Sequence, residues 1–138
     1  MPYWQLHYHL VWATWERAPS ITPTIERVVH QTMLAKAREL GLVLHAVGGV
    51  SDHVHVVASI PPTRTVAEVV KQLKGASSRT VHLSGTAGSA FRWQEGYGAL
   101  TLGRESLARV IEYVQRQKEH HAHGTIVAVY ESAGAPGD

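Results

Sequence analysis

The chain has 138 residues, of which 44% are hydrophobic and 17% charged, a composition typical of one compact globular domain. It contains no cysteine, so a disulfide framework and a thiolate metal site are both excluded. The net charge is only +2, but nine of the 13 Lys and Arg residues lie between Arg64 and Lys118. This distribution is typical of a phosphate-binding face, and equally of an ordinary solvated surface. No segment resembles a signal peptide or a membrane span, so we expect a cytoplasmic protein without membrane association.

The first half of the chain is expected to form three strands and one long helix. Residues 3–14 alternate and are rich in aromatic and β-branched side chains, which predicts a strand. Residues 24–40 have helical spacing, and Gly41 is a plausible stop. Two further strands are predicted over residues 43–47 and 53–60, with Gly48 and Gly49 between them.

The second half is expected to contain two helices and one short strand. Residues 65–83 present apolar side chains at helical spacing, and residues 93–102 predict an irregular segment that ends in a strand. A last helix is predicted from Ser106, a candidate N-cap, to about residue 121. The order β-α-β-β-α-β-α predicts an α+β fold, a ferredoxin-like split βαβ antiparallel sheet with helices on one face plus a C-terminal helix. We expect one domain over residues 1–123 and a partly disordered tail over 124–138, which ends in small and polar residues.

A pair of histidines is the first candidate for chemistry. His53 and His55 are two residues apart on a predicted strand, so both side chains lie on the same face of the sheet. Adjacent imidazoles can bind one metal ion, although two unrelated surface histidines would give the same pattern.

A tyrosine on the last predicted helix is the second candidate. Tyr113 and Gln117 are four residues apart and therefore share a helical face. A phenol can attack a phosphodiester that a metal ion polarises, and Gln117 can offer a carbonyl oxygen as a third metal ligand. His120 and His121 follow closely, and either could replace Gln117. The alternative is that Tyr113 is an ordinary core residue of an amphipathic helix.

Basic, hydroxyl and aromatic side chains are candidates for contacts with DNA. A basic stripe on the helix over residues 65–83 suits a nucleic-acid backbone, and aromatic rings in the segment over residues 91–98 can stack on bases. A solvated helix face and a hydrophobic plug under a loop are the plainer alternatives. The candidate residues are Lys71, Lys74, Ser78, Arg79, Trp93 and Tyr97.

Taken together, these segments resemble the single-tyrosine HUH transposases, named for two histidines separated by one hydrophobic residue. This family includes the small transposases of minimal bacterial insertion sequences and the REP-associated tyrosine transposases. Five stretches match in order and spacing, and together they extend over nearly the whole chain. They are Tyr8–Thr14, Asp52–Val57, Leu73–Arg79, Trp93–Gly98 and Ile111–Gln117.

The resemblance implies a role for each matching residue. His53 and His55 would bind Mg²⁺ or Mn²⁺, with Gln117 as the third ligand. Tyr113 would be the catalytic nucleophile and would form a 5′-phosphotyrosine link while releasing a 3′-OH. The implied substrate is single-stranded DNA with hairpins near the ends of an element, and the implied assembly is a homodimer.

Two other functions are compatible with the same residues. One is an HUH nickase or replication initiator that cuts without transposing. The other is a non-catalytic protein that binds DNA or RNA hairpins, which an intact set of His53, His55, Tyr113 and Gln117 argues against. The glycines before the last helix suggest an arm that swings. A helix on such an arm could dock on its own sheet or on that of a partner subunit. The resemblance implies the second arrangement, in which Tyr113 would serve the histidines of the partner subunit.

Overall fold

A four-stranded antiparallel sheet forms the centre of the computed structural model, which describes residues 3–85, 90–124 and 128–133. The strand order is β2-β3-β1-β4. The strands are β1 (His7–Ala13), β2 (Val43–Val50), β3 (His53–Ser59) and β4 (Gly98–Leu102). All three pairings are antiparallel, and the two middle strands, β3 and β1, place His55 opposite Val11. The α+β fold expected from the sequence is confirmed.

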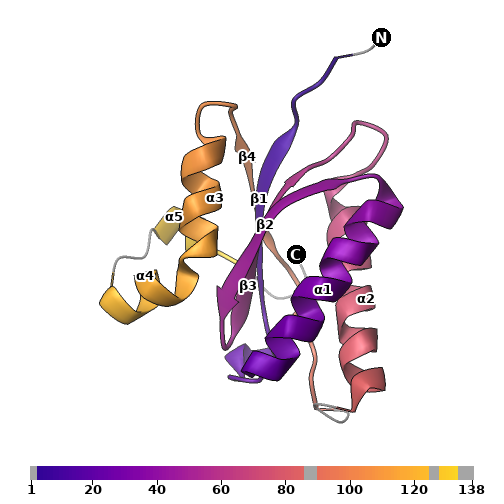
Figure 1. Ribbon diagram of the computed structural model, residues 1–138, viewed down its shortest axis with the longest axis vertical. Coiled ribbons are helices and arrows are strands. Elements are labelled where there is room, and N and C mark those ends of the chain that lie inside the picture. The colour runs from indigo at the N-terminus through magenta and orange to yellow at the C-terminus, as the bar shows by residue number, and fades with distance from the viewer. Residues whose placement is uncertain (1–2, 86–89, 125–127, 134–138) are drawn as a thin grey trace.

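Helices α1 (Pro23–Leu40) and α2 (Val66–Ser84) cover one face of this sheet (Figure 1). Each begins at a threonine whose hydroxyl oxygen accepts a backbone hydrogen bond, Thr22 from Ile25 and Thr65 from Glu68. Each ends at a glycine in the left-handed region, Gly41 or Gly85. The stop at Gly41 is the one that the sequence predicts, and each observed helix end lies within one residue of the predicted end.

The alternation of β3 divides its side chains between two environments. Val54, Val56 and Ala58 are buried in the main core beneath α1 and α2. His53 and His55 therefore lie on the opposite face, together with Val57, which packs in a smaller cluster against the C-terminal helices. The candidate metal ligands are thus kept apart from the apolar core by strand geometry alone.

The C-terminal segment covers the histidine face of the sheet (Figure 1). One helix was expected from Ser106 to about residue 121, but the structure has α3 (Leu107–Gln115) and α4 (Gln117–His123), followed by α5 (Ala128–Glu131). The break is at Arg116, whose φ of −109° and ψ of 28° interrupt the helical path. The expected cap position, Ser106, is confirmed, although its side chain makes no capping hydrogen bond.

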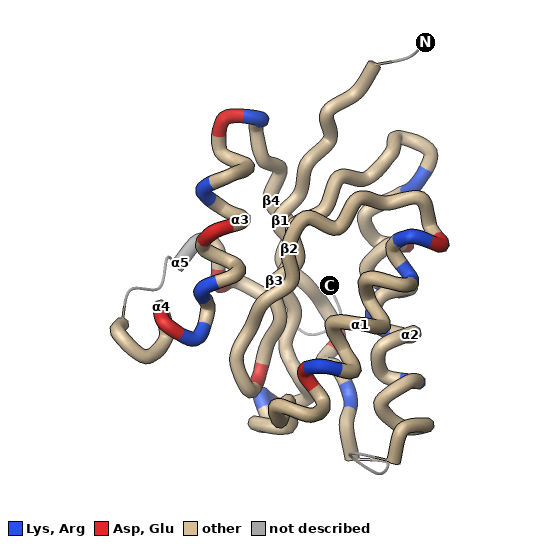
Figure 2. Tube along the Cα trace, in the orientation of Figure 1, with Lys and Arg blue, Asp and Glu red and all other residues tan. Residues whose placement is uncertain are grey.

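Charged residues lie on the helices and loops, and the four strands carry no Lys, Arg, Asp or Glu (Figure 2). In the described parts of the chain, no helix combines the length and the apolar character that crossing a membrane requires. Of the tail expected to be partly disordered, residues 125–127 and 134–138 lie outside the described residues. Residues 128–131 are helical, and they reach the histidine face of the sheet.

Candidate active site

Three buried histidines from the two central strands form the floor of the site. His53 and His55 come from β3, and their ring centroids are 5.1 Å apart. His9 of β1 is stacked on His55 at 5.0 Å, and its Nε2 lies 2.8 Å from Nδ1 of His55. This contact occupies one nitrogen of His55 and leaves its Nε2 directed toward the helices.

Helices α3 and α4 place Tyr113 and Gln117 above this floor. Both side chains are buried, with exposed fractions of 6% and 1%. The predicted shared face is preserved despite the break at Arg116, because both side chains hydrogen-bond to the same carboxylate, that of Glu131. In this single chain Tyr113 lies beside its own histidines, with ring centroids of Tyr113 and His55 6.1 Å apart.

Glu131, at the end of α5, is the residue that joins the two halves of the site. Its Oε1 lies 2.9 Å from Nε2 of His53 and 3.2 Å from Nε2 of His55. Its Oε2 accepts hydrogen bonds from the Tyr113 hydroxyl and, at 3.4 Å, from the Gln117 amide. No helical or strand pattern around Glu131 in the sequence predicts this position.

Asp52 and His121 complete the ring of groups around His53. Strand β3 begins at His53, so Asp52 belongs to the preceding turn, and its Oδ1 lies 2.7 Å from Nδ1 of His53. His121 lies 3.2 Å from Oε1 of Glu131, while His120 stacks on the Tyr113 ring at 4.5 Å. Of the two histidines considered as replacements for Gln117, His121 is the one that reaches the carboxylate.

The electrostatics of the site follow from burial and from these contacts. Burial disfavours a charge on His53, but hydrogen bonds with Glu131 and Asp52 outweigh it and raise the pKa of His53. Burial also lowers the pKa of His55, against the opposing effect of Glu131. The pKa of Glu131 falls well below its ordinary value, because hydrogen bonds from His53, His55 and Tyr113 outweigh the effect of burial. The site therefore holds an ionised carboxylate among imidazoles.

The donor atoms suit a divalent cation. Ligand atoms of His53, His55 and Glu131 all lie within 4.8 Å of one another. Oε1 of Gln117 is buried and has no hydrogen-bond partner among the described residues, a costly arrangement for a polar atom unless something else binds it. Two imidazole nitrogens with carboxylate and amide oxygens form a mixed set that Mn²⁺ and Mg²⁺ accept.

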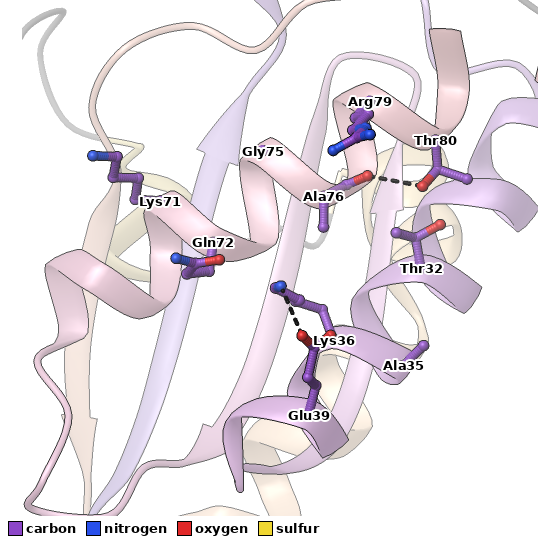
Figure 3. Close-up of a pocket in the computed structure, with 10 residues that line it drawn as sticks. All are labelled: Thr32, Ala35, Lys36, Glu39, Lys71, Gln72, Gly75, Ala76, Arg79 and Thr80. Atoms are coloured by element: carbon purple, nitrogen blue, oxygen red, sulfur yellow. Dashed lines mark hydrogen bonds and ion pairs between the residues drawn. The ribbon is translucent and has the colours of Figure 1, made fainter. Parts of the chain in front are cut away.

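The predicted DNA-contacting residues are not part of this cluster. Lys71 and Arg79 are exposed on α2 and line a groove of about 490 Å³ between α1 and α2 (Figure 3). This groove lies on the opposite side of the sheet from the histidines. Ser78 is half-buried on the same helix.

Lys74, Trp93 and Tyr97 have structural contacts. The Lys74 ammonium donates to the carbonyl oxygens of Gln94 (2.8 Å) and Gly96 (2.7 Å), which fastens this loop to α2. Trp93 donates from Nε1 to Ser77 and packs edge-on against Trp12, and Tyr97 packs against the main core. These contacts match the alternative of a hydrophobic plug, and a role in DNA binding stays a prediction.

Comparison with known proteins gives a consistent set of relatives. The ISDra2 transposase TnpA of Deinococcus radiodurans is 26% identical over 121 residues, covering 84% of this chain and 86% of that protein. The transposase of insertion sequence IS200 from Salmonella typhimurium is 24% identical over 131 residues, covering 91% and 86%.

Solved structures agree with these relatives. The crystal structure of a Deinococcus radiodurans transposase superposes with a TM-score of 0.67 and 27% identity, covering 84% of this chain and 93% of that one. A REP-associated tyrosine transposase bound to a REP hairpin shares the fold, with a TM-score of 0.64 and 12% identity, covering 91% and 73%. The sequence profile described as "Transposase IS200 like" matches residues 2–117, and the chain belongs to this transposase family.

Proposed function

We propose that this transposase cleaves and rejoins single-stranded DNA through a covalent link to Tyr113. The observation that carries the proposal is the convergence of Tyr113, His53 and His55 on one half-buried carboxylate, that of Glu131. The phenol hydroxyl and the two imidazoles come from distant parts of the chain and contact the same carboxylate. A tyrosine that served only to pack the core would not require these polar neighbours. Membership of the family supports the same conclusion.

The proposed chemistry exchanges one phosphate ester bond for another. The Tyr113 oxygen attacks the phosphorus, a new bond forms between them, and the bond from phosphorus to the 3′ oxygen breaks. The phenol proton leaves toward Glu131, which already accepts it in a hydrogen bond, and the departing 3′ oxygen takes up a proton. The product is a 5′-phosphotyrosine and a free 3′-OH. Attack by another 3′-OH reverses these steps, so rejoining needs no ATP.

The proposed metal ligands are His53, His55 and Gln117, and the ion is Mg²⁺ or Mn²⁺. The unpartnered Oε1 of Gln117 supports its inclusion. When bound, the ion supplies charge stabilisation for the phosphate under attack. Asp52 accepts a hydrogen bond from Nδ1 of His53 and so orients the ring with its Nε2 toward the site.

We further propose that the substrate carries hairpins, that the enzyme is a homodimer, and that it acts in the cytoplasm, where the DNA of a bacterial insertion sequence lies. A hairpin stem bound near Lys71 and Arg79 would contact the α1–α2 side of the sheet, while the cleaved strand reaches the opposite side. The REP-associated tyrosine transposase that shares this fold is bound to a REP hairpin, which supports a hairpin ligand.

The test is to incubate the protein with a single-stranded, hairpin-bearing oligonucleotide and Mn²⁺ and to separate covalent adducts on a denaturing gel. Cleavage should leave protein attached to the 5′ end of the fragment downstream of the break, and a free 3′-OH on the other fragment. Tyr113→Phe should abolish the adduct and change DNA affinity by no more than a few-fold, whereas Tyr3→Phe, at an exposed position, should retain it. His53→Ala and a chelator should also abolish it, the latter reversibly. An adduct in Tyr113→Phe, or full activity in excess chelator, contradicts the proposal.

A further inference from the structure

Glu131 is the last residue of α5. It reaches the histidines because α5 folds back over the sheet. We propose that Glu131 is an additional ligand of the metal ion, beside His53, His55 and Gln117. This inference rests on the proposed metal-dependent function and changes its ligand set. It gives α5, which follows the helix that carries Tyr113, a role in forming the site.

The spacing of the donor atoms is the first argument. Two ligands that lie about 2.1 Å from one ion at a right angle are about 3.0 Å from each other. Oε1 of Glu131 lies 2.9 Å from Nε2 of His53 and 3.2 Å from Nε2 of His55. Both distances are those of neighbouring ligands around one ion, and the ligand atoms of all three residues lie within 4.8 Å of one another.

The second argument is the number of imidazoles on one oxygen. Oε1 of Glu131 lies within 3.2 Å of Nε2 of His53, His55 and His121. Hydrogen bonds alone would require all three Nε2 atoms to carry a proton, and His53 also needs one on Nδ1 for Asp52. A divalent cation accounts for the convergence with neutral rings, since each Nε2 lone pair can then face the ion.

The third argument is that the segment carrying Glu131 is packed in place. The ring of Tyr130 lies edge-on to His9 at 5.3 Å and contacts Tyr113 at 5.1 Å between centroids. On the other side, Ser132 passes over Gly98 of β4, where a Cβ would lie 1.8 Å from the Ser132 carbonyl oxygen. A glycine at this position is what allows the backbone to approach so closely. Glu131 is therefore held between two fixed contacts, as a metal ligand must be.

The experiment measures Mn²⁺ binding to the full-length protein without DNA by isothermal titration calorimetry. Glu131→Gln keeps the size and the hydrogen-bonding oxygen but removes the charge, and it should raise the Mn²⁺ dissociation constant at least 10-fold. Glu105→Gln, at an exposed carboxylate, should change it less than two-fold. Gly98→Ala should weaken binding by displacing Ser132, and Gly103→Ala, which has open space around it, should not. Circular dichroism checks that each variant is folded.

The outcomes separate this inference from the proposed function. In one outcome, the wild-type protein binds Mn²⁺, His53→Ala does not, and Glu131→Gln binds it as tightly as wild type. Glu131 is then not a ligand, and the proposed function stands. If His53→Ala binds Mn²⁺ as well as wild type, the metal site of the proposed function fails, and the Glu131 inference fails with it.

Discussion

Helix α3 contacts the sheet at Gly48, where only a glycine leaves enough space. A larger residue at this position should therefore displace Tyr113. A Cβ at Gly48 of β2 would lie 1.9 Å from the backbone oxygen of Val114 and 2.8 Å from its carbonyl carbon. Ordinary contact starts at 3.4 Å, so Gly48→Ala should push α3 away from β2 by about 1.5 Å. The obstacle is backbone, which cannot rotate aside as the end of a side chain can.

This displacement acts on Tyr113, the residue before Val114. A misplacement of about 1 Å in an active site can cost about 100-fold in rate, and we expect at least that loss in adduct formation. The fold should survive, because the main core lies on the other face of the sheet, and α3 packs only in the smaller cluster with Ala46 and Val57. Affinity for the oligonucleotide should change by no more than a few-fold.

The assay is the initial rate of covalent adduct formation on a single-stranded oligonucleotide with saturating Mn²⁺. Gly103→Ala is the control, since it precedes the same helix and its Cβ would meet nothing within 4 Å. A folded Gly48→Ala protein that forms the adduct at the wild-type rate would refute the reasoning. It would mean that the position of α3 on β2 does not set the position of the nucleophile.

Two other predictions concern pH and salt. Burial and the neighbouring His55 lower the pKa of His9 to about 4, so the folded state binds fewer protons than the unfolded state between pH 4 and 6.5. This contribution to stability is present above pH 6.5 and is lost as the pH falls toward 4. The free energy of unfolding in urea should therefore fall by about 2 kcal/mol more in wild type than in His9→Gln between pH 7 and pH 5, and equal slopes would contradict the burial argument. Lys71→Ala or Arg79→Ala should weaken DNA binding for all sequences alike and flatten the salt dependence by about one unit, whereas an effect at one base position would indicate base readout instead.

Much of the fold follows from local signals in the sequence. The helical spacing over residues 24–40 and 65–83, the stop at Gly41 and the alternation of β3 are short-range features. Each predicts the element in which it is found. The break at Arg116 has no such signal, because neither glycine nor proline is present there. Ion pairs of Arg116 with Glu112 and Glu119 span the break, and such pairs also occur in an unbroken helix.

The site was predictable where strand or helix periodicity applies. His53 with His55, and Tyr113 with Gln117, share faces as their spacing requires. Glu131 was not predictable, because its position depends on the chain returning to the sheet after α4. Tyr130 supplies the packing and Gly98 the space for that return, and these two residues are 32 positions apart in the sequence. A contact of this kind is decided by tertiary packing.

The last prediction concerns whether one chain or two build each site. The structure shows α3 on its own sheet, held by an apolar cluster that is separate from the main core. Because α3 would meet the same surfaces on a partner sheet, the homodimer we propose can exchange this helix between subunits. Mixing Tyr113→Phe with His53→Ala tests the exchange. Shared sites give a heterodimer with one intact site, so adduct formation should return toward half the wild-type level per dimer. If heterodimers form and the mixture stays inactive, Tyr113 acts on the histidines of its own chain, in the arrangement of Figure 1.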